Sequence, residues 1–450
     1  MGFRIATTIV FFCLCTVVRV QAAATLFLEE PYSYDGTFAG TGHAAVYLSG
    51  VCATSSVVLR PCLSGERGIV LSRYRGIGGY DWIAIPLIPY LYAVERPEDI
   101  PLFADKSLVA FLRDTYRRNH LETIVPDLPD GDTPGGAWYQ LIGASYLRTI
   151  YAFEIETLKG QDDNLIRSLN GTSNHQRWKL VTANCADFIR QIFSFYYPQS
   201  VHRSIIGDLG VTTPKQLART LSKYTRRHPD LQASRFVIPQ VPGTIPRSKR
   251  VRGVFEVLLT SKKYMLPIFL FHPYASAIAV AVYVEHWHFN PAKSTPIMDS
   301  NDKLGNALTS TDRRVLQGQL EELVKASGAQ DADAGAGGRH WASLRADAVP
   351  TLDEFGGPAL WVPVGTEALS VGITRSNILS SLAGFRFAAE LVEARLREEL
   401  TSPVAKKTAR SDVEIDLALL QQLLASKPRP SENTTALATQ SSAYFFGAAR

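Results

Sequence analysis

The sequence lacks several features that would assign it to a common class of protein. It contains no internal repeat, no glycine-rich phosphate-binding loop followed by lysine, and no HExxH zinc-binding helix. Its formal net charge of +5 over 450 residues is too small to indicate nucleic acid, because such partners need a concentrated basic patch. We therefore expect no cofactor, no metal site of this kind and no nucleic-acid partner.

Cysteine is scarce, with five in the whole chain. Cys13 and Cys15 fall in an N-terminal apolar run, which leaves Cys52, Cys62 and Cys185 in the remainder. In an oxidising compartment two of these three tend to pair, and Cys52 and Cys62 are close enough in sequence to close a short loop. Two reduced, buried cysteines are the alternative. If the pair forms, Cys185 is the odd thiol, which marks it as a candidate reactive group.

The N-terminus has the pattern of a secretory signal peptide. Arg4 precedes an apolar run over residues 5–18 that is too short to span a bilayer comfortably, and residues 21–24 supply small side chains for cleavage. We expect a signal peptide over residues 1–24 and a secreted or periplasmic protein, with membrane association as a further possibility. An uncleaved N-terminal anchor is the alternative.

The chain is too long for one ordinary core, so its length predicts more than one domain. The sequence becomes rich in proline after residue 234 and rich in proline, serine and threonine after residue 426. We expect a first domain over residues 25–233, a mixed α/β region over residues 234–426, and a disordered tail over residues 427–450.

The predicted fold class is α+β, with an antiparallel sheet packed on helices. Apolar runs bounded by glycine and proline predict strands at residues 44–48, 57–59 and 69–71. Helical periodicity predicts helices at residues 108–120 and 138–157. Two prolines make residues 83–94 an edge strand or extended wall rather than a helix, and residues 164–174 are polar and turn-like.

Two segments of the second half raise the question of a membrane. The basic run Arg247, Lys249, Arg250 and Arg252 most simply forms a solvated face, and contact with a membrane surface is the alternative. Residues 266–284 form an apolar run of membrane-spanning length that Pro267, His272 and Pro273 interrupt. Basic residues flank this run on the side expected to be outside, so we favour buried strands over a transmembrane helix.

Cys185 opens the stretch with the clearest chemical interpretation. Thr182 or Asn184 can cap a helix whose apolar residues recur at helical spacing through Tyr196. A thiol in the first turn lies near unpaired N–H groups and the positive end of the helix dipole, which favour the nucleophilic thiolate. The alternative is a small cysteine buried on the packing face of the helix.

A thiol nucleophile needs a base, and His43 is the strongest candidate. It follows Gly40-Thr41-Gly42 and opens a predicted strand, so its ring can project from the strand end into a cleft. The alternative is a histidine satisfied by local backbone groups.

These motifs resemble those of the circularly permuted papain-like fold, the group that includes NlpC-type peptidases in permuted form, lecithin–retinol acyltransferase-like proteins and a bacterial periplasmic family. The resemblance covers roughly residues 34–225. It lies in Gly42-His43-Ala44 on an early strand, Asn184-Cys185 at a helix start, and a following helix that opens at Thr213-Pro214.

The resemblance implies thiol hydrolase or acyltransferase chemistry. Cys185 would attack a carbonyl, His43 would act as general base, and the helix start at Asn184 and Cys185 would provide an oxyanion site. Families of this fold orient the histidine with a third polar residue on the next strand. Residues 54–56 hold only Thr and Ser in that zone, so Tyr74 or Glu66 are the substitutes to consider.

The leading hypothesis is a secreted or periplasmic cysteine hydrolase of amide or ester bonds in peptide, peptidoglycan or lipid-like acyl substrates. A catalytically inactive envelope-binding module on the same scaffold is the first alternative. A membrane-tethered structural protein is the second, and it depends on residues 266–284 spanning a bilayer.

Overall fold

The computed structural model describes most of the first 257 residues and shorter stretches beyond them. The described residues are 21–34, 37–38, 40–101, 104–204, 208, 210–241, 245–246, 248–254, 256–257, 274, 277, 281, 289–291, 296–298, 307–309, 349–353, 356–364, 367–372, 374, 414 and 417.

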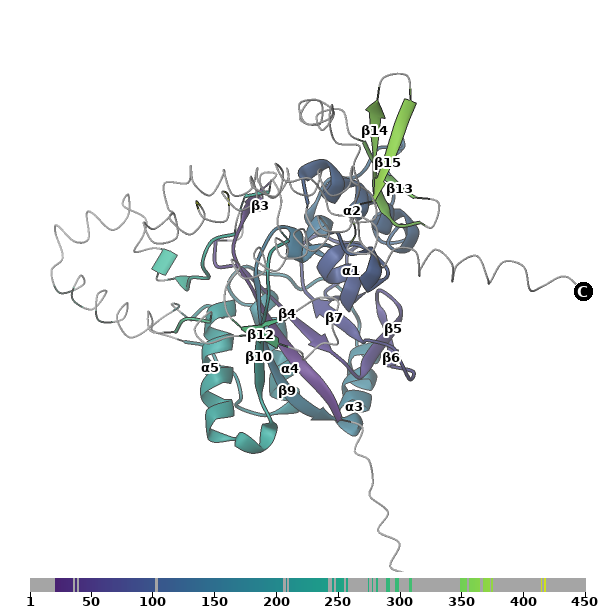
Figure 1. Ribbon diagram of the computed structural model, residues 1–450. Helices are drawn as coiled ribbons and strands as arrows, with labels where there is room; N and C mark the ends of the chain where they lie inside the picture. Colours follow the sequence, from purple (N-terminus) through teal and green to yellow (C-terminus); the bar gives the residue numbers. More distant parts are fainter. Residues whose placement is uncertain are drawn as a thin grey trace, which may run out of the picture.

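An eight-stranded sheet forms the centre of the molecule (Figure 1). Its strands are antiparallel except for the parallel pair β10–β11. In spatial order they are β12 (Ala307–Thr309), β11 (Pro296–Met298), β10 (Ser234–Ile238), β9 (Ile150–Leu158), β1 (Gln21–Glu29), β4 (His43–Leu48), β7 (Ile69–Ser72) and β8 (Ile83–Pro86). Strands and helices together make this an α+β fold, as the sequence predicted.

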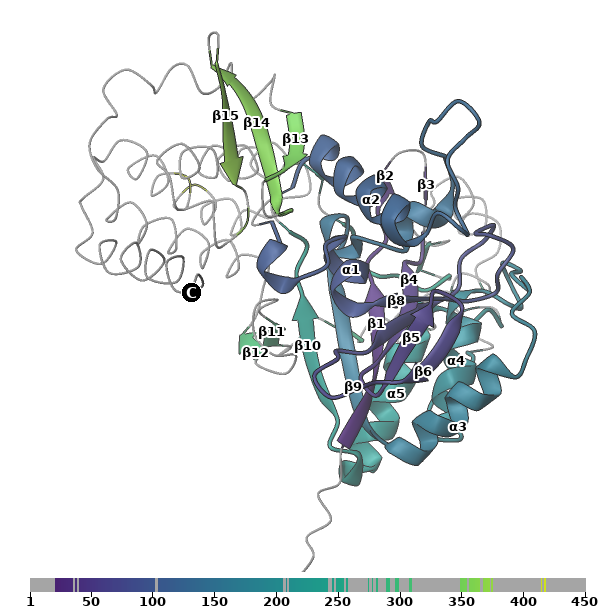
Figure 2. The same ribbon diagram turned by 90° about the vertical axis from the view of Figure 1, so that its right-hand side faces the viewer.

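The two faces of the sheet bury different cores because strand side chains alternate between faces. Ala44 and Val46 of β4 pack with α3 (Lys159–Asn170), α4 (Cys185–Tyr196) and α5 (Pro214–Arg227). Ala45 and Tyr47 pack instead with α1 (Leu87–Tyr92) and α2 (Lys106–His120). Figure 2 shows α3, α4 and α5 gathered along one side of the sheet. Short 3₁₀ turns complete the chain: η1 (Pro97–Asp99), η2 (Ala137–Gln140), η3 (Ala144–Tyr146) and η4 (Pro229–Leu231).

The long helices begin where the sequence supplies capping groups. Asp105 accepts the N–H of Leu108 at 2.8 Å at the start of α2. Thr213 accepts the N–H of Gln216 at 3.2 Å at the start of α5, and Pro214 occupies the first helical position. These side chains satisfy N–H groups that a helix start otherwise leaves unpaired.

Three smaller sheets accompany the large one. β13 (Val349–Leu352), β14 (Pro358–Val364) and β15 (Glu367–Gly372) form an antiparallel sheet whose Leu360 joins the core beside α1 and α2. This sheet is drawn in green next to α2 in Figure 2. β2 (Ser33–Tyr34) pairs with β3 (Thr37–Phe38), and β5 (Val51–Ser55) pairs with β6 (Val58–Pro61).

The prediction of a helix at residues 138–157 is wrong. The segment contains η2 and η3 and then enters β9, which hydrogen-bonds to β1 on one side and β10 on the other. The spacing of Tyr139, Ile142 and Tyr146 resembled a helical repeat. Tyr139 and Tyr146 instead lie in η2 and η3, Ile142 lies in the bend between them, and all three pack on the core.

Two shorter predictions also need correction. Residues 83–94 form strand β8 and then helix α1, which accommodates Pro89 because a helix tolerates proline in its first turn. The polar stretch 164–174 contains the second half of α3, whose Leu165 and Ile166 are buried against the sheet. By contrast, β4, β7 and α2 lie where the sequence predicted strands and a helix.

The sheet crosses two boundaries that the sequence suggested. β10, β11 and β12 extend the sheet of the first domain beyond residue 233. Residues 21–24, assigned to the signal peptide, begin β1 and pair with Leu158 through Ile155 of β9. Residues 1–20 and the tail at 427–450 lie outside the described residues.

Within the described part of the chain, no helix combines the length and the apolar character needed to cross a bilayer. The apolar run 266–284 lies outside the described residues apart from three isolated positions, so its assignment to buried strands or to a membrane helix stays a prediction.

Candidate functional site

Cys185 is the first residue of α4, and Asn184 caps the helix. The Asn184 Oδ1 accepts the N–H of Asp187 at 2.9 Å, and the Asp187 carboxylate accepts the N–H of Asn184 at 3.4 Å. Of the two capping candidates in the sequence, Asn184 and not Thr182 takes the role. This reciprocal cap fixes the position of the thiol at the helix N-terminus.

The cap is also tied to the segment that leads into α5. Asn184 Nδ2 donates to the carbonyl oxygens of Leu180 and Thr212, both at 3.1 Å. Thr212 Oγ1 and Arg203 Nη2 donate to Asp187 Oδ1 at 2.6 and 2.7 Å. Asp187 and Asn184 are almost fully buried. Asp187 was not predicted from the sequence, although its place three residues after a capping asparagine was the available signal.

The loop before α4 is fastened to the loop before β8. Asn174 Oδ1 accepts the N–H groups of Asp81 and Trp82 at 3.0 Å, and its Nδ2 donates to the Trp82 carbonyl at 2.9 Å. Asp81 forms a buried ion pair with Arg73 at 2.5 Å, and the Arg73 guanidinium lies over the Phe188 ring of α4. These contacts fix the chain before Cys185, at Asn174, and after it, at Phe188.

His43 opens β4 immediately after a glycine that no other residue can replace without strain. Gly42 has φ of +81°, and a Cβ there would lie 2.2 Å from the carbonyl oxygen of Glu29. Glu29 is also the cross-strand partner of His43. The backbone of Gly42 packs directly against the Glu29 carbonyl, and this contact fixes the position of His43 at the start of β4.

The His43 ring is 4 % exposed and stacks on the ring of Tyr74, with centroids 4.1 Å apart and planes 10° from parallel. Its Nε2 has no hydrogen-bond partner among the described residues. A buried ring nitrogen without a hydrogen bond to any described residue is energetically costly.

The Cys185 sulfur lies at the beginning of β4, close to the backbone N–H groups of Ala44 and Ala186, which act to lower its pKa. Ala44 directly follows His43 in the strand. The fold therefore brings the two residues that the sequence singled out, 142 positions apart in the chain, to one end of one strand.

The two side chains do not hydrogen-bond to each other in the described structure. The sulfur is next to Ala44, whose side chain belongs to the core that contains α4. The His43 ring stacks on Tyr74, which belongs to the core on the opposite face. A direct transfer of the thiol proton therefore needs the imidazole to turn away from Tyr74 toward the sulfur.

A buried ion pair lies beside His43. Arg148 Nη1 is 2.8 Å from Glu29 Oε2, and both side chains are fully buried; the pair has no hydrogen-bond geometry between these atoms. Tyr90 donates its hydroxyl proton to Glu29, and the Arg148 guanidinium lies 4.4 Å from the centre of the Tyr32 ring. Neither charged residue of this pair was identified from the sequence, because they are far apart in the chain.

Burial and Arg148 set the protonation states of the site. Burial lowers the pKa of His43 well below its ordinary value, and the positive charge of Arg148 lowers it further. Burial raises the pKa of Cys185 to about 11, although Ala44 N–H, Ala186 N–H and Arg148 act in the opposite direction. The residue as a whole is half-buried, so it is the surroundings of its sulfur that disfavour the thiolate. At neutral pH the site therefore holds a thiol and a neutral imidazole.

Of the two candidates to orient the histidine, only Tyr74 touches it. Tyr74 contacts His43 through its ring, while its hydroxyl donates to the Gln140 carbonyl at 3.0 Å. Glu66 accepts two hydrogen bonds from Arg60 at 2.6 Å in the β5–β6 region, with no described contact to His43. Glu66 is therefore a local ion-pair partner there, and its assignment as an orienting residue is corrected.

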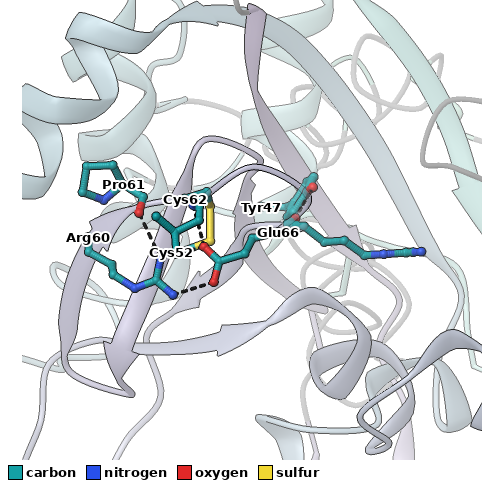
Figure 3. The surroundings of a disulfide bond; sticks show 8 residues. Tyr47, Cys52, Arg60, Pro61, Cys62 and Glu66 are labelled. Atoms are coloured by element: carbon teal, nitrogen blue, oxygen red, sulfur yellow. Dashed lines mark hydrogen bonds and ion pairs between the residues drawn. A yellow bond between two sulfur atoms is a disulfide. The ribbon is translucent and has the colours of Figure 1, made fainter.

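Cys52 and Cys62 are joined by a disulfide that staples the β5–β6 hairpin, with the Arg60–Glu66 ion pair beside it (Figure 3). Cys185 is the free cysteine of the described chain. The two cysteines and Glu66 also form a group with metal-ligand spacing, but the sulfurs are bonded to each other. They therefore offer no thiolate to a metal ion.

Three members of the basic run, Lys249, Arg250 and Arg252, are exposed, and Arg247 lies outside the described residues. Their contact with a membrane surface stays a prediction.

No protein-family model matches the sequence, and comparisons with curated proteins and with solved structures find no match either.

Proposed function

We propose that the protein is an exported cysteine hydrolase or acyltransferase that acts on amide or ester bonds, with Cys185 as nucleophile and His43 as general base. One observation carries the proposal. The sulfur at the start of α4 lies close to the backbone N–H of Ala44, the residue after His43, and the His43 Nε2 is buried without a partner among the described residues. The order of these elements in the chain is that of permuted papain-like proteins, which supports the same reading.

In the proposed reaction, Cys185 Sγ attacks the substrate carbonyl carbon while its proton passes to the Nε2 of His43. The tetrahedral oxyanion lies near the N–H of Cys185 itself at the start of α4, where the helix dipole favours negative charge. His43 then protonates the leaving amine or alcohol, and a thioester remains on Cys185. Water, or a second alcohol or amine, releases the acyl group.

The neutral site implies that the thiol is activated only when substrate is bound. The pKa of Cys185 is raised and that of His43 is lowered, so the two groups do not form an ion pair in the free protein. Substrate entry would turn the imidazole from its stack on Tyr74 toward the sulfur. Peptides, peptidoglycan stems and lipid-like acyl esters all present the required carbonyl group.

Acylation by an activated ester tests the proposal. We expect p-nitrophenyl acetate to acetylate Cys185, with the adduct located by peptide mass spectrometry. The substitution His43→Gln should slow acetylation by about 10²-fold or more, the usual contribution of a general base. His120→Gln is the matched control, because His120 is an exposed residue of α2 paired with Glu95. Equal acetylation rates for the two variants would reject His43 as the base.

A second candidate function is a catalytically inactive binding module that keeps the same scaffold. The observation that favours it is the stack of His43 on Tyr74 in the core on the face of the sheet opposite α4, together with the raised pKa of Cys185. Failure of both the activated ester and a thiol alkylator to modify Cys185 in the folded protein at neutral pH would select this candidate.

A further inference from the structure

A cavity of about 290 Å³ lies at the same end of the sheet as Cys185. Its wall includes Glu30, the residue after β1, Tyr151 of β9 and Lys215 in the first turn of α5. The segment leading into α5 connects the two places, because the Thr212 carbonyl accepts a hydrogen bond from the Asn184 cap of α4. The same segment therefore contacts the cap of α4 and leads into the helix that supplies Lys215 to the cavity wall.

The carboxylates in the cavity wall already have partners. Glu256 pairs with Lys215 at 2.5 Å and accepts the N–H of Gly253 at 2.8 Å. Glu30 accepts hydrogen bonds from the hydroxyls of Tyr151 at 3.0 Å and Ser248 at 2.6 Å. Their negative charges are thus compensated within the protein, and they present little attraction to a cation in the cavity.

Positive charge is in excess in the same wall. The wall contains three basic residues, Lys215, Arg250 and Arg252, and two carboxylates, so its formal net charge is +1. Arg250 is exposed and makes no ion pair or hydrogen bond with any residue that the structure describes. An unpaired guanidinium at the mouth of a concave site is a ready partner for a carboxylate or a phosphate group, which it can bind through two parallel hydrogen bonds.

The remaining wall consists of Val251, Phe289 and Pro291, which are apolar, and of Asn290. Val251 is buried, and Phe289 packs against Phe153 of β9 with ring centroids 6.2 Å apart. A purely inorganic ion would leave these side chains unused. A ligand with an apolar or aromatic body and an anionic end would bury its body against Phe289 and place its anionic end at Arg250.

We propose that this cavity binds a small organic anion, a carboxylate or phosphate attached to an apolar body. If the proposed function holds, the cavity is the subsite that recognises an acidic part of the substrate beside the bond attacked by Cys185, and this second statement rests on the proposed function. The basic run then includes a specific binding element rather than a general solvated face.

Binding of model ligands tests the inference without requiring catalysis. Ligand-observed NMR titrations with phenylacetate, phenyl phosphate and inorganic phosphate would use the full chain carrying Cys185→Ala, so that no reaction occurs. We expect both phenyl ligands to bind, and the tighter of the two will show whether the cavity prefers a carboxylate or a phosphate. Inorganic phosphate should bind at least about tenfold more weakly because it lacks the apolar body. The substitution Arg250→Gln should weaken both phenyl ligands about tenfold, as expected for loss of a charge-assisted bond.

Lys249→Gln is the matched control, because it removes the same charge from the adjacent exposed residue, which is not part of the cavity wall. It should leave affinity within about twofold. Equal losses in the two variants would show general electrostatics only and would overturn the site. Inorganic phosphate as tight as phenyl phosphate would also overturn it. Binding with the expected pattern but no acetylation of Cys185 in the wild-type chain would keep the site and reject the hydrolase.

Discussion

Replacing Asn184 by alanine should destabilise α4 by about 3 kcal/mol. Removal of the cap acceptor, which holds the Asp187 N–H at 2.9 Å, costs about 1 kcal/mol. Loss of the two bonds from Nδ2 to the carbonyls of Leu180 and Thr212 adds about 1 kcal/mol each. Asn184→Asp keeps the acceptor and loses the two donors, so we expect about 2 kcal/mol for that variant.

The assay is urea-dependent alkylation of Cys185, located by peptide mapping. Exposure of this thiol reports the opening of α4 itself, because it is the first residue of the helix. A loss of about 3 kcal/mol corresponds to roughly a hundredfold increase in the open population. Asn119→Ala on the exposed face of α2 is the control and should change stability by less than about 0.5 kcal/mol. A loss below about 1 kcal/mol for Asn184→Ala would refute the assignment of Asn184 as the anchor of the site.

Five further predictions concern the charged groups of the site and the disulfide of the β5–β6 hairpin. The raised pKa of Cys185 means that alkylation of the free protein should accelerate about tenfold per pH unit up to about pH 11. Because an unfolded cysteine ionises near pH 9, Cys185 should also make the fold less stable as the pH rises from 9 to 11, and Cys185→Ala should reduce this decline in urea titrations. The lowered pKa of His43 acts at the other end: the unfolded chain takes up a proton below about pH 6.5 and the folded one does not, so acid should destabilise the protein less after His43→Gln. Arg148→Met leaves Glu29 buried and unpaired, which should cost about 3–5 kcal/mol of unfolding free energy, and adding Glu29→Gln should recover part of it; no recovery would contradict the ion pair. Cys52→Ser opens a short loop and should lower stability by at most about 3 kcal/mol, measured as a shift of the urea midpoint, and an unshifted midpoint would contradict it.

Local signals in the sequence predicted the elements that carry the candidate residues. The apolar run after Gly42 marked β4, and the capping asparagine with its following apolar repeat marked α4. Both signals depend only on residues close together in the sequence, so the tertiary fold does not alter the elements that they predict. The topology that brings β4 and α4 together depends on contacts between residues far apart in the chain, which these local signals do not specify.

The elements that the sequence misassigned are those whose identity depends on distant partners. β9 lies between β1 and β10 and is buried along most of its length. Its apolar residues therefore do not follow the simple two-residue alternation of a half-exposed strand throughout. The alternation of Phe153, Ile155 and Thr157 with Glu154 and Glu156 was the signal that distinguished a strand. The Glu29–Arg148 pair is set entirely by that tertiary pairing, since 119 positions separate the two residues.

β1 is the first described strand in the chain and one of the innermost strands in the sheet. Its register with β4 can form early, but its other edge stays open until residues 150–158 have been synthesised. A nascent chain therefore cannot close this sheet while it is still short. Until then, the unpaired edge of β1 is free to pair with an edge strand of another chain.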